Sequence, residues 1–230
     1  ENYSSKKLDL SSIKIITSTG SPLAEESFKY VYKNIKQDVH LASIAGGTDL
    51  VGCLVLGNLY SNVHKGEIQG QSLGIDVDVF NDNGKSTKDG DKGELVVKKP
   101  FPSMPVKFWG DDEGQKYYKA YFSRFENIWH HGDFIERTYN NGFIMRGRSD
   151  STLNPGGVRI GTSEIYQQVE DIEYITEGLV VGQDYNDDVR IILFVTTKSN
   201  EELNEEKIKS IKLKIRKNCS PKHVPSLVIK

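Results

Sequence analysis

The sequence predicts an α/β protein that ends in a small α+β module, and three observations lead to this fold class. Short runs of apolar and β-branched residues flank one helix-forming stretch near the N-terminus, which is the order of a parallel strand–helix–strand unit. Further along, polar connections rich in Gly and Asn separate pairs of strand-like runs, as in antiparallel hairpins. A Pro-Gly-Gly cluster at 155–157 then precedes a region with its own helices and strands.

The N-terminal unit is expected to contain buried strands. Continuous apolar runs at 13–19, 39–45 and 52–56 are typical of strands that are covered on both faces. Between the first two, residues 24–33 predict a helix, with Pro22 near its first turn, where a missing N–H costs nothing. This order of elements predicts a parallel unit.

Two hairpins are expected next. Residues 74–80 alternate apolar and acidic side chains, as a half-exposed strand does, and 93–99 form the returning strand after a polar, Gly-rich connection. A second hairpin is predicted from 134–138 to 143–148, with Asn-Gly at its turn.

The C-terminal module is predicted to begin near residue 150. Ile165 and Ile172 fall on one face of a helix predicted over 162–172, and Thr162 is placed to cap it. The module continues with strands at 179–181 and 189–196 and a helix at about 202–218.

Charge and composition argue against several classes of protein. The 230 residues carry 30 Lys and Arg against 32 Asp and Glu, a net charge of −2. A dedicated nucleic-acid binder would attract phosphates with an excess of positive charge. The sequence contains no run of about 18 apolar residues, so it predicts no membrane-spanning helix. Cys53 and Cys219 are far apart in sequence and fit reduced thiols of a cytoplasmic protein, with Cys53 packed in a core.

Four clusters combine residue types suited to ligand binding, and the first is STGSPL at 18–23. A predicted strand ends here and turns through Gly20, Ser21 and Pro22 into a helix. Such turns expose backbone N–H groups that can hold a nucleotide or an anion. An ordinary tight turn is the alternative explanation of the same residues.

The second cluster is AGGTDL at 45–50, where a strand ends in Gly46 and Gly47 and lets a ligand approach the backbone. Thr48 and Asp49 follow, and a hydroxyl beside a carboxylate suits a phosphate together with its Mg²⁺. A helix N-cap formed by Thr48 or Asp49 is the alternative.

The third cluster is WHHGDF at 129–134. Its two histidines and Asp133 are metal-ligand types, so a His-Asp metal hydrolase is one hypothesis. Adjacent side chains of an extended strand point to opposite faces, which disfavours one shared metal. Asp133, which follows a Gly at an expected strand start, is better placed to accept two hydrogen bonds from ribose hydroxyls.

The fourth cluster is GRSDSTLNPGGVRIGTSEI at 147–165. It contains Arg148 and Arg159, and the planar, always-charged guanidinium group suits phosphate recognition. Surface salt bridges, which contribute little to stability, are the alternative.

In this order the four strings resemble the motifs of the acyl-adenylate-forming enzymes, a family of acyl-CoA synthetases, adenylation domains and luciferases. TGSPL resembles the adenine-side loop of that family, AGGTDL its Thr-Glu motif and WHHGDF its Thr-Gly-Asp motif. The resemblance covers the chain from about Ile13. GELVVKKPFPSMPVKFWGD at 93–111 is most similar to the branch that contains the acetyl- and acetoacetyl-CoA synthetases.

The resemblance implies a piece of a longer enzyme, in agreement with a start at Glu1 and an end at Lys230. Residues 1–149 would be the last part of a large N-terminal AMP-binding domain. Residues 150–230 would be most of a small, mobile α+β C-terminal domain, with the hinge at Asp150. The Ser/Thr/Gly-rich phosphate loop of the family has no counterpart here, and its catalytic lysine is expected beyond Lys230.

The resemblance also implies roles in the large domain. Residues 20–22 would line the adenine, Asp133 would hold the ribose hydroxyls, and Thr48 would contact phosphate as a catalytic residue. Asp49 stands where the family usually has Glu, so it would bind Mg²⁺ with a shorter reach.

At the end of the large domain, Arg148 would reach the ribose or a phosphate near Asp133. In the small domain, Arg159 would be a catalytic residue on the nucleotide phosphate. Gly157 would flank the tunnel for the thiol arm of coenzyme A, and Arg216 would contact a phosphate of coenzyme A. From Lys207 onward the chain has eight Lys or Arg and no acid. A solvated helix face is the alternative explanation for Arg216.

One departure from the family bears on the substrate. Acetyl-CoA synthetases have a Trp two residues before the motif Thr, and Gly46 holds that position here, next to Gly47. The resemblance therefore implies an acyl pocket for an acid larger than acetate, such as acetoacetate. The predicted protein is an AMP-forming acid–thiol ligase that uses ATP, Mg²⁺ and coenzyme A. A non-catalytic, truncated nucleotide-binding or interaction module is the alternative.

Overall fold

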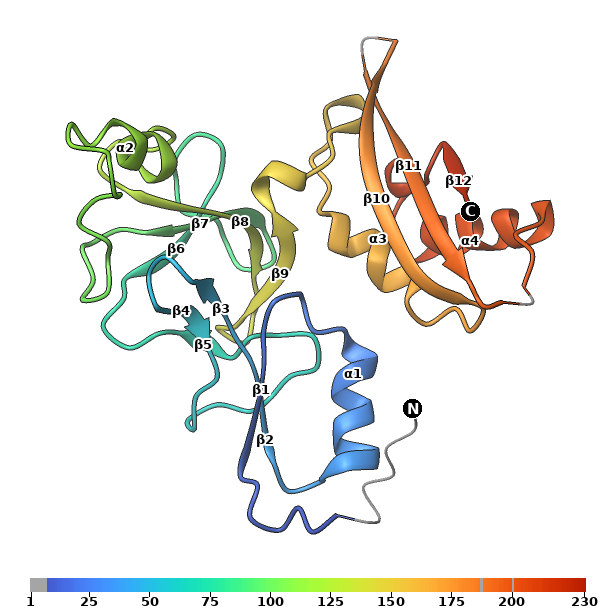
Figure 1. Cartoon of the computed structure of the whole chain (residues 1–230), viewed down its shortest axis with the longest axis horizontal. Helices are drawn as coiled ribbons and strands as arrows, with labels where there is room; N and C mark the ends of the chain where they lie inside the picture. The colour runs from blue at the N-terminus through green and yellow to red at the C-terminus, as the bar shows by residue number, and fades with distance from the viewer. Residues whose placement is uncertain (1–7, 187, 200) are drawn as a thin grey trace. The chain divides into compact units, whose positions relative to one another are not determined.

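A computed structural model of the chain describes residues 8–186, 188–199 and 201–230 (Figure 1). The chain divides into two compact units, and the division falls between Met145 and Arg146. The predicted hinge residue, Asp150, lies shortly after this division, in the 3₁₀ turn Ser149–Ser151. Its role as a hinge stays a prediction. No helix among the described residues is long and apolar enough to cross a membrane.

The first unit begins with the predicted strand–helix–strand arrangement. Strands β1 (Ile15–Ser18) and β2 (His40–Ser43) pair in parallel. Between them, α1 (Glu25–Tyr30) continues into a wider π-helical turn (Val31–Ile35). Phe28 on α1 is buried, which ties the helix to this unit. The prediction of a parallel unit is therefore confirmed.

A small antiparallel sheet follows β2 directly. It consists of β3 (Ala45–Gly47), β4 (Gly52–Leu56) and β5 (Gly70–Gln71), in that order. The expectation of one strand over 39–45 is wrong, because the backbone leaves the β1–β2 pair after Ser43 and turns into β3. The strand predicted over 52–56 coincides with β4.

The largest sheet of the first unit has the order β6-β7-β8-β9 and contains both predicted hairpins (Figure 1). One pair of cross-strand partners is Glu94 and Phe134, and the next is Val96 and His130, so one residue of β7 faces residues 131–133 of β8. This β-bulge was not predicted. The strands are β6 (Val77–Phe80), β7 (Lys92–Val97), β8 (Trp129–Arg137) and β9 (Phe143–Arg148).

A short helix, α2 (Gln115–Tyr121), precedes β8 and was also not predicted. Its aromatic side chains pack against a core that the large sheet shares with the small one. Fully buried members of this core include Leu50, Leu54, Val79, Leu95, Trp129 and Ile135.

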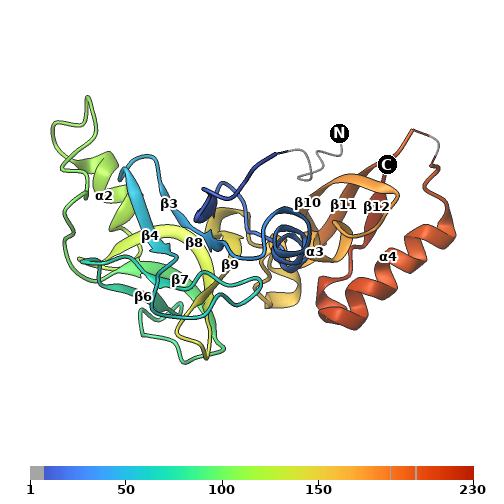
Figure 2. The same ribbon diagram turned by 90° about the horizontal axis from the view of Figure 1, so that it is seen from below.

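The second unit is an α+β layer structure, as predicted. Its sheet has the order β10-β11-β12, with β10 and β11 antiparallel and β11 and β12 parallel. Apolar residues of both helices, including Ile165 and Ile211, pack with inward-facing strand residues such as Leu193. Figure 2 shows α4 running beside this sheet. The elements are α3 (Thr162–Val169), β10 (Ile175–Tyr185), β11 (Asp188–Thr197), α4 (Glu205–Asn218) and β12 (Leu227–Ile229).

The start of α3 differs from the prediction. Thr162 is the first helical residue and not the cap, because Gly161 takes the extended cap position. The backbone N–H of Gly161 donates to Oε1 of Glu164 at 3.0 Å, which satisfies one group at the helix entrance. The helix ends at Val169, before the predicted end at Ile172, because the chain turns there and the N–H of Ile172 bonds to the carbonyl of Val169.

Candidate functional site

The first two ligand-binding clusters meet at one edge of the β1–β2 pair. Ser18 and Ser43, the last residues of the two parallel strands, are cross-strand partners. The N–H of Ile44 continues the ladder to the carbonyl of Ser18 at 2.9 Å. The loop through Gly20 and the strand β3 therefore both start at the carboxyl edge, where ligands bind in open parallel sheets.

Gly20 gives the first loop an exposed backbone. Its φ of +91° is a conformation that side chains other than glycine rarely adopt, and no atom lies within 4 Å of the place where a Cβ would be. Gly20 thus exposes its backbone at the edge where the resemblance places an adenine.

Thr48 and Asp49 lie on the turn between β3 and β4, and both are exposed. Gly47 and Gly52, on either side of this turn, are cross-strand partners, so the helix N-cap alternative is wrong. Val51 closes the turn with a φ of +49°, and its N–H bonds to the carbonyl of Thr48 at 3.3 Å. A β-branched residue in this conformation costs about 1–3 kcal/mol, a strain that is typical of functional sites.

The carboxylate of Asp49 has chemistry that fits Mg²⁺. The phenol of Tyr121 donates to its Oδ2 atom, and its Oδ1 atom covers Gly47. Mg²⁺ binds one or two carboxylates together with water and phosphate oxygens, and an exposed Asp49 leaves room for both. Among the described residues, no three His, Cys, Asp or Glu side chains gather closely enough to hold a metal by themselves.

The two glycines of the predicted acyl pocket have different surroundings. A Cβ on Gly46 would lie 2.1 Å from the carbonyl oxygen of Gly52, so glycine is required there by the close approach of two backbones. The absence of a side chain at Gly46 is therefore no measure of pocket size. A Cβ on Gly47 would instead meet side chains, Oδ1 of Asp49 at 2.0 Å and Cε1 of His131 at 3.1 Å.

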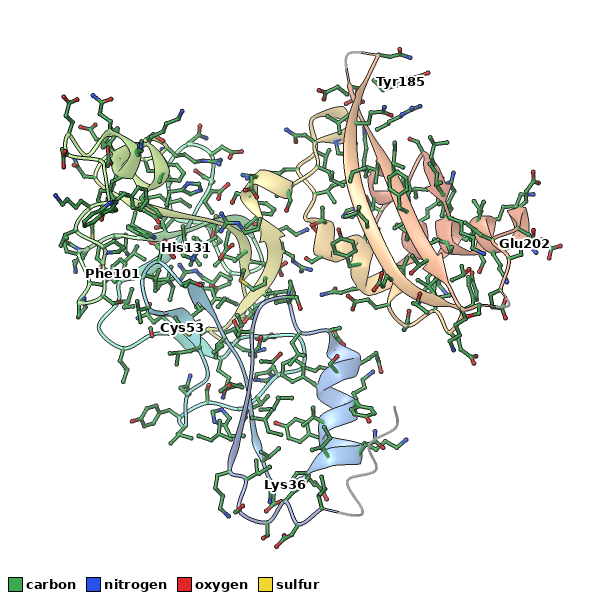
Figure 3. The ribbon with its side chains drawn as sticks, viewed as in Figure 1. Lys36, Cys53, Phe101, His131, Tyr185 and Glu202 are labelled. Atoms are coloured by element: carbon green, nitrogen blue, oxygen red, sulfur yellow. The ribbon has the colours of Figure 1, made fainter. Side chains whose placement is uncertain are left out.

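The two histidines of WHHGDF have separate partners, in agreement with their expected opposite directions. The Nε2 atom of His130 lies 2.8 Å from Oε2 of the fully buried Glu94. His131, which is labelled in Figure 3, is buried, and the indole N–H of Trp129 donates to its Nδ1 atom at 3.4 Å.

Asp133 lies within β8, and the expectation that it stands at a strand start is wrong, since β8 begins at Trp129. Gly132, with a φ of +82°, forms the bulge that precedes it. Bulges re-aim side chains beside functional sites. The carboxylate of Asp133 is buried, and its Oδ2 atom lies 3.7 Å from Nε2 of His131.

An aromatic layer supports this region, and sequence analysis missed it. The ring of Tyr121 stacks on Trp129, with centroids 3.7 Å apart and planes 12° apart. Tyr117, one turn earlier on α2, also packs on Trp129, and burial raises the pKa of its phenol. The spacing of these tyrosines, i and i+4 in QKYYKAYF, is the signal that could have revealed the helix.

In the second unit, Arg148 and Asp150 lie at the start and are both exposed. Nε of Arg148 is 3.8 Å from Oδ1 of Asp150, a surface pair worth little in energy. The hydroxyl of Ser151 donates to the carbonyl of Arg148 at 3.0 Å, which closes the 3₁₀ turn.

Gly157 and Arg159 belong to a loop closed by Leu153 and Ile160, which exchange two backbone hydrogen bonds of 2.8 Å. The half-buried Arg159 donates from Nε to Oγ1 of Thr152 at 3.2 Å. Gly157 has a φ of +74° and open space around it. It also lines a cavity of about 640 Å³ beside the β10–β11 hairpin, whose tip carries Tyr185 (Figure 3).

Arg216 is exposed in the last turn of α4, beside Lys217. Positive charge is favourable at a helix C-terminus. Other basic residues of this region are engaged within the unit: Lys212 donates to the carbonyl of Ser226 at 2.8 Å, and Lys214 pairs with Asp171.

The structure thus brings together part of the predicted site. Asp49 and His131 both lie near Gly47, and Asp133 lies near His131 in the first unit. Arg148, Arg159, Gly157 and Arg216 all lie in the second unit.

Comparisons with known proteins are consistent across sequence and structure, although no protein-family model matches the chain. The chain is 57% identical over 221 residues to the acetoacetyl-coenzyme A synthetase of Rhizobium meliloti (strain 1021) and 48% identical over 224 residues to the acetoacetyl-CoA synthetase of Gallus gallus. Each alignment covers 96% of this chain but only 34% or 33% of the relative. The chain therefore spans about a third of the length of these relatives.

Solved structures lead to the same group. The acetoacetyl-CoA synthetase from Streptomyces lividans superposes with a TM-score of 0.88 at 39% identity, over 97% of this chain and 34% of that one. A benzoate CoA ligase from Burkholderia xenovorans LB400, at 21% identity, shares the fold with a TM-score of 0.77 over 94% of this chain and 42% of its own. The part that matches is the C-terminal part of these ligases.

Proposed function

The chain is a relative of the acetoacetyl-CoA synthetases within the acyl-adenylate-forming superfamily, and from this premise we propose that it forms part of an AMP-forming acid–thiol ligase. The proposed substrates are acetoacetate, ATP and coenzyme A. In the first half-reaction, a carboxylate oxygen attacks the α-phosphorus of ATP, which gives an acyl-adenylate and pyrophosphate. In the second, the thiol of coenzyme A attacks the acyl carbon and AMP leaves.

The observation that carries the proposal is the convergence of three motifs in the first unit. The loop at 20–22 and strand β3 start at the same sheet edge, and a Cβ atom on Gly47 of β3 would lie 3.1 Å from Cε1 of His131 in β8, two residues before Asp133. We assign the adenine to residues 20–22 and the ribose hydroxyls to Asp133. The hydroxyl of Thr48 then faces the phosphates, where donors stabilise the charge of the transferring group.

Asp49 is the proposed Mg²⁺ ligand. Its exposed carboxylate supports this assignment, because Mg²⁺ keeps several waters and binds phosphate oxygens at the same time. When bound, Mg²⁺ neutralises charge on the phosphates. The phenol of Tyr121 donates a hydrogen bond to this carboxylate and orients it.

The second unit supplies the remaining proposed groups. Arg148 and Arg159 are assigned to the nucleotide, and Gly157 and Arg216 to coenzyme A. The open space at Gly157 supports a path for a thin thiol arm, because no side chain fills that position. Alternating use of these groups would require the second unit to rotate about Asp150 between the half-reactions.

Two further parts of the proposal concern the acid and the compartment. The acyl chain is assigned to the side of Gly47, where Asp49 and His131 are the neighbours, and acetoacetate is the preferred acid. The two cysteines are free thiols, which supports a reducing compartment such as the cytoplasm. The 230-residue chain alone is expected to be inactive, for want of the phosphate loop and the lysine expected beyond Lys230.

The test is ATP–pyrophosphate exchange by the full-length protein that contains this chain, with acetoacetate, butyrate and acetate as acids. We expect exchange with acetoacetate above that with acetate. Exchange with acetate alone would contradict the proposed acid. A protein that binds ATP but supports no exchange with any acid would favour the non-catalytic module.

A further inference from the structure

The proposed function assigns no role to the side chain of His131 in the first unit. His131 stands where the resembling motif has Thr, and it is buried, with 7% of its surface exposed. Its imidazole lies near Gly47, on the proposed acyl side, and near the carboxylate of Asp133, on the proposed ribose side. A buried imidazole needs defined hydrogen-bond partners, because an unsatisfied ring nitrogen is costly.

The contact with Trp129 determines which ring nitrogen of His131 carries the proton. An indole N–H can only donate, so Nδ1 of His131, at 3.4 Å from it, must accept. In the neutral imidazole the proton is then on Nε2. That atom lies 3.7 Å from Oδ2 of Asp133, which is beyond hydrogen-bond distance but close enough for the polar N–H to attract the carboxylate.

The side chain of Trp129 is fixed in place by its burial and by its aromatic neighbours. Only 2% of its surface is exposed, and the ring of Tyr121 stacks on it at 3.7 Å, with Phe101 packing edge-on at 5.5 Å. The plane of His131 lies 22° from that of Trp129. The aromatic layer therefore restricts the rotation of His131 as well as its tautomer.

We propose that His131 is a positioning residue for the ribose site: held as the Nε2–H tautomer by Trp129, it orients the carboxylate of Asp133 toward the 2′- and 3′-hydroxyls of the nucleotide. This inference rests on the proposed function and deepens it. The bulge at Gly132 interrupts the regular pairing just before Asp133, so the neighbours of this side chain contribute to the direction of its carboxylate.

The test compares ATP with 2′,3′-dideoxy-ATP, using calorimetric titration of the full-length protein, which needs no turnover. The variants are His131→Leu, which removes the donor, and His131→Gln, whose amide N–H can replace Nε2–H. We expect His131→Leu to weaken the binding of ATP about fivefold, because the carboxylate of Asp133 loses a polar neighbour, and to leave the binding of the dideoxy nucleotide unchanged. His131→Gln should recover most of the difference.

Tryptophan substitutions provide a matched pair. Trp129→Phe keeps an aromatic ring but removes the N–H that selects the tautomer, so it should reduce the preference for ATP over the dideoxy nucleotide. Trp109→Phe is the control, because Trp109 is fully exposed and has no proposed part in nucleotide binding. Equal effects of the two substitutions would overturn the proposal.

Equal losses of both nucleotides in His131→Leu would also overturn it, since a merely structural role affects binding without regard to the hydroxyls. A wild-type protein that binds both nucleotides equally would refute the inference but leave adenylation intact. A wild-type protein that binds no nucleotide would refute both proposals.

Discussion

The carbonyl oxygen of Gly52 lies 2.1 Å from the position that a Cβ atom of Gly46 would occupy. Cα of Cys53 is 2.6 Å from the same point. Neither atom is the end of a flexible side chain, so any substituent at Gly46 must push the backbones of β3 and β4 apart. These strands carry the turn with Thr48 and Asp49, so the hairpin geometry of the site depends on this glycine.

Gly46→Ala is therefore expected to destabilise the chain by about 2 kcal/mol or more, as overpacking of a tight contact does. Gly52→Ala is the matched control on the facing strand, because its Cβ would meet neighbours at ordinary distances of 3.5 and 3.6 Å. Denaturant unfolding measures both. Equal stability of the two variants would contradict the close approach.

Asp78 should make the stability of the first unit depend on pH. Burial alone would raise the pKa of this carboxyl, but hydrogen bonds from the Ser86 hydroxyl at 2.6 Å, the Val79 N–H at 2.8 Å and the Lys98 ammonium at 3.1 Å outweigh burial. The net pKa lies below the ordinary value of 3.8. The stabilisation is complete above the unfolded pKa and is lost as pH falls through the folded pKa.

Asp78→Asn should consequently lower the free energy of unfolding at pH 7 and flatten its fall below about pH 4. The control is Asp112→Asn, whose side chain is 94% exposed and pairs with Lys107 only at 3.9 Å. Urea unfolding at a series of pH values measures this free energy. If the free energy of unfolding of Asp78→Asn falls as steeply in acid as that of the unsubstituted chain, Asp78 contributes no such pH dependence.

Local patterns predicted the elements whose partners are close in sequence. The parallel β1–α1–β2 unit follows from continuous apolar runs on either side of a helix, and the hairpin of β6 and β7 from alternation and a Gly-rich connection. Such patterns depend on period and turn chemistry, which the chain carries locally.

The features that shape the site depend on distant partners and were missed. The strand expected over 39–45 breaks because Gly46 pairs with β4, which comes later in the chain. The bulge at 131–133 is defined by the register of β7 against β8, and no residue of WHHGDF reveals that register by itself. The family resemblance identified Asp133, but only the structure shows that His131 lies near Asp133 and that Trp129 donates a hydrogen bond to His131.

Tyr121 is expected to tune the proposed Mg²⁺ site through its hydrogen bond to Asp49. Tyr121→Phe keeps the ring that stacks on Trp129 but frees the carboxylate. Removal of partners that orient metal ligands costs about 10- to 100-fold in metal affinity, so the Mg²⁺ concentration for half-maximal exchange should rise about tenfold. Tyr118→Phe, on an exposed tyrosine of the same helix, is the control. An unchanged Mg²⁺ dependence of exchange would contradict the assignment of Asp49 as the Mg²⁺ ligand.

Arg216 is expected to act on coenzyme A alone. Arg216→Ala should raise KM for coenzyme A about tenfold, the loss of a charge-assisted hydrogen bond, and leave KM for ATP unchanged. The neighbouring Lys217→Ala, in the same exposed turn of α4, is the matched control. If both variants change KM for coenzyme A equally and weakly, Arg216 belongs to a solvated helix face.

Asp150 is expected to separate the two half-reactions. It lies in an exposed 3₁₀ turn shortly after the division between the compact units, and a rotation there requires its backbone dihedrals to change. Asp150→Pro fixes φ near −65°, and also restricts Ser149, so it should hold the second unit in one orientation. We expect the full-length variant to retain ATP–pyrophosphate exchange and to lose most thioester formation.

Asp150→Ala, which removes the pair with Arg148 but keeps the freedom to rotate, should retain both activities. Equal loss of the two half-reactions in Asp150→Pro would contradict the hinge, because a hinge affects the passage between half-reactions and not the chemistry of the first.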